Sequence, residues 1–139
     1  MTDTPTSAPA AKGTVLLVDD DKFLLDMYGM KFSGAGYTIQ ACPSAKDALG
    51  ILRGGFNPDV ILFDITMPEL DGFAFLKALS DEKLATKAIK IALTNQSDEA
   101  ERTKAMELGA MRYIVKASMI PSEVVNTVQE ELSKVSAKG

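Results

Sequence analysis

Hydrophobic and polar positions alternate along the chain in blocks that predict strands and helices in turn. Short runs of aliphatic and β-branched residues, bounded by polar residues or glycine, are typical of parallel strands that are buried on both faces. Such runs predict strands over Thr14–Val18, Tyr37–Ala41, Asp59–Phe63, Ile89–Leu93 and Met111–Val115.

The segments between these runs carry the signals of helices. Ser44 is a typical N-cap, Gly34 and Gly109 follow the last periodic residue of their segments, and Pro121 suits a first helical turn. The predicted helices span Asp21–Ser33, Ser44–Arg53, Gly72–Ser80, Asp98–Leu108 and Pro121–Ser133. Strands that alternate with helices predict an α/β fold, with a parallel sheet covered by helices on both faces.

The first residues of the chain differ from the rest. Residues 1–13 are rich in Pro, Thr, Ser and Ala and show no periodicity, so we expect a disordered N-terminal leader there. The length of 139 residues fits one folded domain, which we expect over residues 14–136.

Composition narrows the classes of function. Fifteen lysines and arginines stand against nineteen aspartates and glutamates, so no basic surface is expected for nucleic acid or for an anionic membrane. No apolar run approaches the ~20 residues of a membrane span, so no membrane insertion is expected. A single cysteine, Cys42, suits a reducing compartment, and the expected location is cytoplasmic. The chain has no histidine, so any histidine chemistry must come from a partner.

Polar side chains directly follow four of the predicted strands. Asp19 and Asp20 follow the first, Asp64 the third, Thr94 the fourth and Lys116 the fifth. In an open α/β sheet, the carboxyl ends of the strands line the ligand crevice. We therefore expect these five residues to lie at one edge of the sheet.

The residue types at this edge predict a magnesium-assisted phosphate site. Carboxylates that lie close together repel one another unless a cation neutralises them, and oxygen ligands favour Mg²⁺. Lys116 offers a positive charge to phosphate oxygens, and Thr94 offers a hydroxyl donor. Asp64 can act as a carboxylate nucleophile that forms an aspartyl phosphate.

Four motifs occur in order along the chain: VLLVDDD, DVILFDITMPELDG, IALT and YIVK. In this order and at these spacings they resemble the receiver domain of two-component response regulators, chemotaxis-type and single-domain, over about Thr14 to Ser133. The resemblance implies a flavodoxin-like, doubly wound five-stranded parallel sheet in the order 2-1-3-4-5, with five helices.

The resemblance also implies roles for the residues at the strand ends. Asp64 resembles the phosphoacceptor, and Asp20 a direct metal ligand. Asp19 resembles a ligand that acts through water, and the backbone carbonyl of Thr66 a main-chain ligand. The implied cofactor is Mg²⁺, with Mn²⁺ as a substitute.

Thr94 and Tyr113 resemble a switch pair, in which the threonine binds the new phosphate and the ring turns inward, and Lys116 resembles the phosphate-binding lysine. The implied phosphoryl donor is a histidine kinase or a histidine phosphotransfer protein. The implied target protein contacts the face of the fourth helix, fifth strand and fifth helix. Such a protein is a phosphoacceptor switch, and its only catalysis is of its own phosphorylation and dephosphorylation.

Ala117 and Asn95 depart from the pattern, and together with neighbours of the site they are expected to tune its chemistry. Ala117 replaces the usual proline, so the Lys116–Ala117 bond is either a costly cis bond (~2.5–4 kcal/mol) or a trans bond that shifts Lys116. Asn95 replaces a small residue and is expected to narrow access to the phosphate or to hinder Tyr113. Gln96, like Thr66, lies where a neighbour of the site can tune hydrolysis.

Three alternative functions are also considered for the same residues. A receiver-like module could bind partners without phosphorylation. A haloacid-dehalogenase-type phosphatase would use Asp19 and Asp21, although Phe23 stands where that family has Thr or Val. In a flavodoxin-like electron carrier, the acidic run would repel the FMN phosphate.

Some residues can also be explained by an ordinary structural role, without a part in the function. Tyr113 could be ordinary strand packing, Asp21 a solvated loop charge and Cys42 an inert thiol. The methionines are expected to fill the core or its margin: Met27, Met30, Met67, Met106 and Met111.

Overall fold

The computed structural model describes residues 12–138, in which strands and helices alternate. The strands are β1 (Thr14–Val18), β2 (Thr38–Cys42), β3 (Val60–Asp64), β4 (Ile89–Thr94) and β5 (Arg112–Val115). The helices are α1 (Lys22–Gly34), α2 (Ala45–Arg53), α3 (Gly72–Asp81), α4 (Glu99–Glu107), α5 (Pro121–Lys138) and the short 3-10 helix η1 (Lys116–Ser118).

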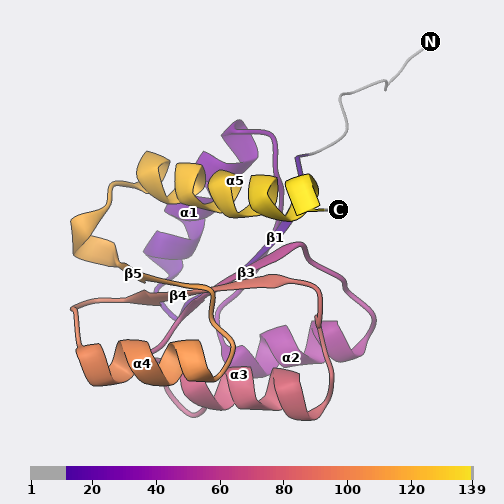
Figure 1. Ribbon diagram of the computed structural model, residues 1–139, viewed down its shortest axis with the longest axis vertical. Helices are drawn as coiled ribbons and strands as arrows, with labels where there is room; N and C mark the ends of the chain where they lie inside the picture. The colour runs from indigo at the N-terminus through magenta and orange to yellow at the C-terminus, as the bar shows by residue number, and fades with distance from the viewer. Residues whose placement is uncertain (1–11, 139) are drawn as a thin grey trace.

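The strands form one parallel sheet in the order β2-β1-β3-β4-β5, which confirms the predicted fold. Figure 1 shows α1 and α5 on one side of this sheet and α2, α3 and α4 on the other. All strands therefore end at the same edge, where the connections to the helices lie.

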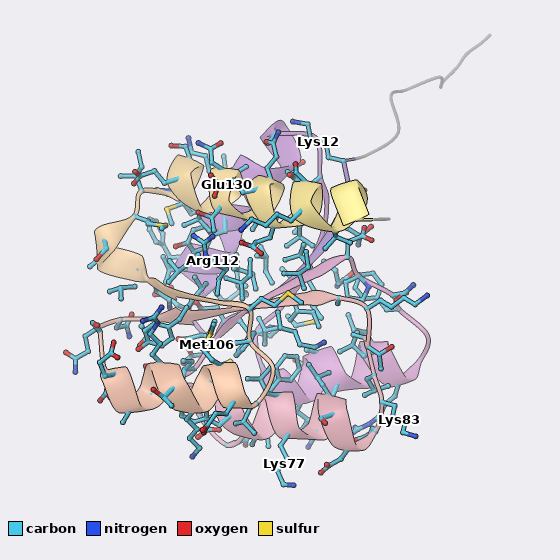
Figure 2. The ribbon with its side chains drawn as sticks, in the orientation of Figure 1. Lys12, Lys77, Lys83, Met106, Arg112 and Glu130 are labelled. Carbon is cyan, nitrogen blue, oxygen red and sulfur yellow. The ribbon has the colours of Figure 1, made fainter. Side chains whose placement is uncertain are left out.

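Side chains fill the space between the sheet and both helix layers (Figure 2). On β1, Leu16 and Val18 pack toward α2 and α3, whereas Val15 and Leu17 pack toward α1 and α5. Successive side chains of a strand point to opposite faces, so a central strand covered on both sides must be apolar throughout. Arg112 extends from β5 toward α5, where its guanidinium lies 2.9 Å from Glu131 Oε2.

The element boundaries agree with prediction to within one residue, except at the end of α5. The second strand starts one residue later than expected, at Thr38, and α5 continues past Ser133 to Lys138. Of the expected leader, residues 1–11 lie outside the described part, whereas the Lys12 N–H donates to the Gly36 carbonyl at 2.9 Å. Among residues 12–138, every helix is too short or too polar to span a membrane.

The prediction for the methionines was wrong in part. Met67 is buried and Met27 packs at the margin of the core, but Met30, Met106 and Met111 are 75%, 40% and 51% exposed. Met30 lies on the outer side of α1, whose inward positions are taken by other aromatic and aliphatic side chains: Leu25, Tyr28 and Phe32. Helical spacing alone could not separate these two faces, because both carry apolar residues.

Gly72 allows the connection from β3 to α3 to fold back tightly over the strand end. A Cβ at Gly72 would lie 2.7 Å from Ile65 Cα and 2.9 Å from the Asp64 carbonyl oxygen. The Gly72 N–H donates to the Ile65 carbonyl at 2.8 Å, which closes this loop. Only glycine fits here, and the loop that it closes carries Thr66.

We expect Gly72→Ala to lower the free energy of unfolding by ~1–3 kcal/mol, since the new methyl group would push the backbone beside Asp64. The matched control is Gly50→Ala, at an exposed position of α2 where no neighbouring atom of the described part of the chain lies within 4 Å of the new Cβ. This control should gain ~0.5–1 kcal/mol, because alanine favours a helix over glycine. Urea denaturation measures both, and equal stability of the two variants would contradict the close packing at Gly72.

Candidate functional site

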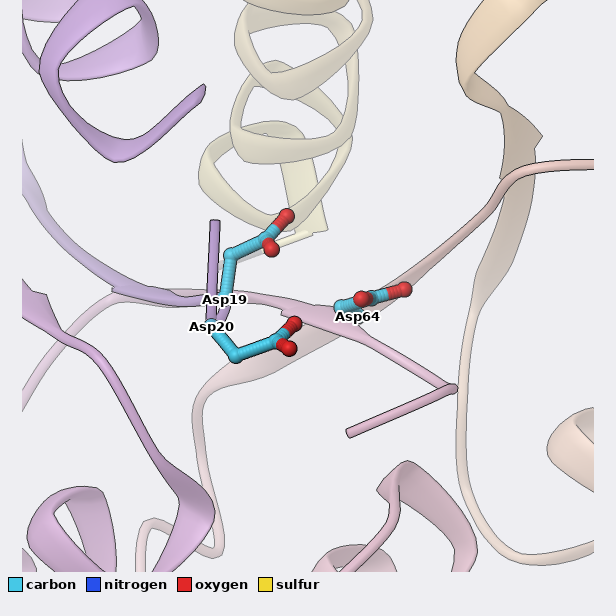
Figure 3. Close-up of side chains that lie close together, drawn as sticks. All are labelled: Asp19, Asp20 and Asp64. Carbon is cyan, nitrogen blue, oxygen red and sulfur yellow. The ribbon is translucent and has the colours of Figure 1, made fainter. Parts of the chain in front are cut away.

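Three carboxylates meet where β1 and β3 end. These strands are neighbours, with Val18 paired to Phe63, so the residues that follow them come together. One oxygen each of Asp19, Asp20 and Asp64 lies within 4.8 Å of the others (Figure 3). Asp19 and Asp64 are 3% exposed, whereas Asp20 faces solvent.

Lys116 directly follows β5, an edge strand of the sheet, and its side chain contacts this acidic cluster. Its Nζ lies 2.8 Å from Asp19 Oδ2 and 3.6 Å from Asp64 Oδ1. Residues 12–138 contain no cis peptide bond, so the Lys116–Ala117 bond is trans. The lysine nevertheless contacts both acids, and the substitution of the usual proline by Ala117 has not moved it away from them.

The hydrogen bonds of the cluster leave one atom unsatisfied. Asp19 accepts from the Asp21 N–H at 2.9 Å through Oδ1 and from Lys116 through Oδ2. Asp64 Oδ1 is buried and has no hydrogen-bond partner among residues 12–138. Because an unpaired buried acceptor is costly, this oxygen is suited to a ligand.

Asp21 has a different role from its neighbours. Its side chain is exposed and accepts hydrogen bonds from the Phe23 and Leu24 N–H groups, so it is the N-cap of α1. The acidic cluster contains Asp19 and Asp20 rather than the Asp19–Asp21 pair that a haloacid-dehalogenase-type phosphatase would use.

The surroundings of Asp64 give it a higher pKa than that of an ordinary carboxyl group. Burial raises the pKa of Asp64 to about 6, and the charges of Asp19 and Asp20 add to the rise, against the opposing effects of Lys116 and the Thr66 backbone N–H. Burial alone would lower the pKa of Lys116, but its hydrogen bond to Asp19 and the charges of both acids outweigh burial and raise it. Fully ionised, three carboxylates and one ammonium leave two excess negative charges, which a divalent cation would balance.

The predicted pair Thr94 and Tyr113 is brought together by a third residue. Thr94 Oγ1 lies 2.8 Å from Glu101 Oε1, and the Tyr113 hydroxyl lies 2.7 Å from the same oxygen. Thr94 is 4% exposed, and Tyr113 packs partly against the core while its hydroxyl makes this contact.

Sequence reasoning missed Glu101. It lies three residues after the N-cap Asp98, a spacing that suggests a glutamate folded back on the helix start. Its backbone N–H does donate to Asp98 Oδ1, but its carboxylate turns instead toward the strand ends. No pattern in the sequence gives this direction.

The remaining predicted residues surround the site. Thr66, Asn95, Gln96 and Ala117 all have exposed side chains. Asn95 and Ala117 line a hollow of about 450 Å³ together with Lys116 and the aromatic Tyr28, a second residue that sequence reasoning missed. Burial raises the pKa of Tyr28, whose ring lies on the inner side of α1.

Cys42 lies outside this site. It is buried at the end of β2, and burial raises the pKa of its thiol to about 11. The reactive form of cysteine is the thiolate, and this raised pKa keeps the thiol protonated at neutral pH.

Sequence comparison with known proteins finds relatives along most of the chain. Residues 15–129 match the response regulator receiver domain model. An uncharacterised 14.6 kDa protein of Leptolyngbya boryana is 30% identical over 120 residues, which are 86% of this chain and 90% of that protein. The response regulator SaeR of Staphylococcus aureus is 31% identical over 121 residues, which are 87% of this chain and 51% of SaeR, so the chain spans about half of that relative.

Solved structures agree with these relatives. A CheY-like response regulator receiver domain protein of Methanospirillum hungatei JF-1 superposes with a TM-score of 0.81 at 25% identity, over 91% of this chain and 98% of that one. A putative response regulator of Chloroflexus aurantiacus J-10-fl gives a TM-score of 0.78 at 30% identity, over 87% and 98%. The chain therefore belongs to the response regulator receiver domain family.

Proposed function

We propose that the protein is a phosphorylation switch that accepts a phosphoryl group on Asp64 from a phosphohistidine of a partner protein. The observation that carries this proposal is the buried, unpaired Oδ1 of Asp64, which lies 3.6 Å from the Lys116 ammonium. In the transfer, the bond from phosphorus to the donor nitrogen breaks and a bond from phosphorus to an Asp64 oxygen forms. The electron pair stays on the departing imidazole, which belongs to the partner because this chain has no histidine.

The donor set at the site fits a hard divalent cation. Asp20 would bind it directly, Asp19 through water, and Asp64 and the Thr66 carbonyl would complete the protein ligands. When bound, Mg²⁺, or Mn²⁺ in its place, neutralises the excess carboxylate charge that would otherwise repel a phosphate. The residues of the chain then orient the two reacting groups.

Lys116 and Thr94 would hold the phosphoryl oxygens after transfer. The Lys116 ammonium already lies beside the carboxylate that gains charge, so little rearrangement is needed. Thr94 would donate its hydroxyl, and Tyr113 would follow as the second member of the switch pair. Thr66, Asn95, Gln96 and Ala117, exposed around the site, would set the lifetime of the phosphoryl group.

The proposed partners follow from this chemistry. The donor is a histidine kinase or a histidine phosphotransfer protein in the cytoplasm. A target protein would distinguish the two states through the face of α4, β5 and α5, because Glu101 and Tyr113 join the site to that face. In this proposal the phosphoryl group ends on Asp64 of the chain itself, so the protein acts as a phosphoacceptor rather than as an enzyme.

A second candidate is a receiver-like module that binds partners without phosphorylation. The observation that favours it is the hydrogen bond of the Thr94 hydroxyl to Glu101, which engages the donor that a phosphoryl group would need. The two candidates differ in whether the protein gains a phosphoryl group.

Incubation with a phosphorylated histidine kinase, or with acetyl phosphate and Mg²⁺, should add the mass of one phosphoryl group to the intact chain. Asp64→Asn should abolish this gain, because an amide oxygen is a poor nucleophile toward phosphorus. Asp26→Asn, which neutralises an exposed acid of α1, should be phosphorylated like the wild type. No Asp64-dependent gain from either donor would favour the module that acts without phosphorylation.

The raised pKa of Asp64 predicts a specific dependence of stability on pH in metal-free protein. Between its unfolded value of 3.8 and its folded value of about 6, the folded state binds more protons than the unfolded state. The contribution of Asp64 to the free energy of unfolding therefore falls as pH rises through this window and stays low above it. At pH 7.5 with EDTA, Asp64→Asn should be more stable than wild type by ~1–3 kcal/mol, and the gain should shrink toward pH 4.

Added Mg²⁺ should stabilise the wild type at pH 7.5. It should stabilise Asp64→Asn much less, because this variant lacks one carboxylate ligand for the ion and one of the negative charges that the ion would neutralise. Thermal and urea denaturation with EDTA or Mg²⁺ measure both effects. Equal stabilisation of the two proteins by Mg²⁺, or an EDTA-treated variant less stable than wild type, would refute the repulsion that we describe.

A further inference from the structure

Two hydroxyl groups from different strands converge on a single carboxylate oxygen. Glu101 Oε1 lies 2.8 Å from Thr94 Oγ1, at the end of β4, and 2.7 Å from the Tyr113 hydroxyl on β5. Glu101 itself belongs to the first turn of α4. One carboxylate therefore ties the start of a helix to two adjacent strands.

The chemistry of these groups sets the direction of both bonds. An ionised carboxylate can only accept, so each hydroxyl donates its single proton to Glu101. Hydrogen bonds to a charged acceptor are about twice as strong as those between neutral groups. The Gln96 carbonyl lies farther from both hydroxyls, at 3.2 Å from Thr94 and 3.5 Å from Tyr113.

Thr94 cannot serve Glu101 and a phosphoryl group at the same time. Leu93 pairs with Asp64 across β4 and β3, so Thr94 is the next residue beyond the strand position opposite Asp64. Thr94 is only 4% exposed, so little water can reach its hydroxyl to replace a lost hydrogen-bond partner. A phosphoryl group on Asp64 that takes the Thr94 proton must therefore break the bond to Glu101.

We propose that Glu101 is a positioning residue that holds the Thr94 and Tyr113 hydroxyls away from the phosphoryl site and so weakens the affinity of that site for a phosphoryl group. This inference rests on the proposed function of Asp64 and adds its regulation. Once Thr94 turns to the phosphoryl group, Glu101 keeps only the Tyr113 hydroxyl. The first turn of α4 then loses one of the contacts that hold it to the sheet, which links the site to a partner-binding face.

The test compares Glu101→Gln with a neighbouring charge change. Glu99 lies in the same first turn of α4, its side chain is 82% exposed, and its carboxylate faces Arg102 at 3.8 Å. Glu99→Gln therefore removes the same charge near the same helix start without touching Thr94 or Tyr113. Both variants are titrated with beryllofluoride, a phosphoryl analogue, in excess Mg²⁺ by isothermal calorimetry.

Glu101→Gln should bind beryllofluoride about tenfold more tightly than wild type, because a neutral acceptor holds the Thr94 proton less strongly. Glu99→Gln should stay within about twofold of wild type. Glu101→Asp, with a shorter side chain, should also bind more tightly, and it serves if the glutamine variant folds poorly. Equal or weaker binding by both Glu101 variants overturns the inference.

A second readout reports the contact itself without metal or phosphoryl analogue. Burial raises the pKa of Tyr113, and the hydrogen bond and charge of Glu101 raise it further. An NMR titration of ¹³Cζ-labelled tyrosine, with Tyr113→Phe to assign the signal, should show a lower Tyr113 pKa in Glu101→Gln and no change in Glu99→Gln. An unchanged Tyr113 pKa in Glu101→Gln also overturns the inference.

The outcomes separate this inference from the proposed function. If wild type binds beryllofluoride in an Asp64-dependent way and the Glu101 variants bind equally well, only the role of Glu101 fails. If neither wild type nor Glu101→Gln binds beryllofluoride, the proposed function fails and the role of Glu101 fails with it.

Discussion

Mutual repulsion among Asp19, Asp20 and Asp64 is the constraint on which the rest of the molecule depends. Parallel strands that end at one edge force these carboxylates together, and the buried position of Asp64 deprives it of water. Lys116 relieves the repulsion only in part, since it lies closer to Asp19 than to Asp64. In the function that we propose, a divalent cation would neutralise the remaining negative charge and a phosphoryl group would then be accepted, so the carboxylates would be held close together at a cost in local stability.

Hydrogen bonds join the end of β4 and the side chain of Tyr113 on β5 to the start of α4. Thr94 ends the strand next to β3, and Tyr113 lies on the following strand, so both are within reach of events at Asp64. Glu101 accepts hydrogen bonds from both hydroxyls, and it belongs to α4, whose first turn lies at the surface. In the function that we propose, a charge that appears on Asp64 would change the α4 side of the sheet through these hydrogen bonds.

Much of the fold and of the acidic edge was predictable from sequence, for a physical reason. A strand buried on both faces must be apolar, so the first acid after VLLV or VILF marks a strand end, and parallel strands bring such ends together. Glu101 and Tyr28 were not predictable in this way, because their contacts depend on side-chain direction rather than on chain position. Met30 was placed wrongly since α1 carries apolar residues on its outer face as well as its inner face.

The measurement that tests the central claim most directly is a crystal structure of the protein grown with Mg²⁺ and beryllofluoride. Our account predicts a cation among Asp19, Asp20 and Asp64, beryllium bonded to an Asp64 oxygen, and fluorines in contact with Lys116 Nζ and Thr94 Oγ1. A structure in which the acidic edge binds neither ion, with Lys116 turned away from Asp64, would contradict it.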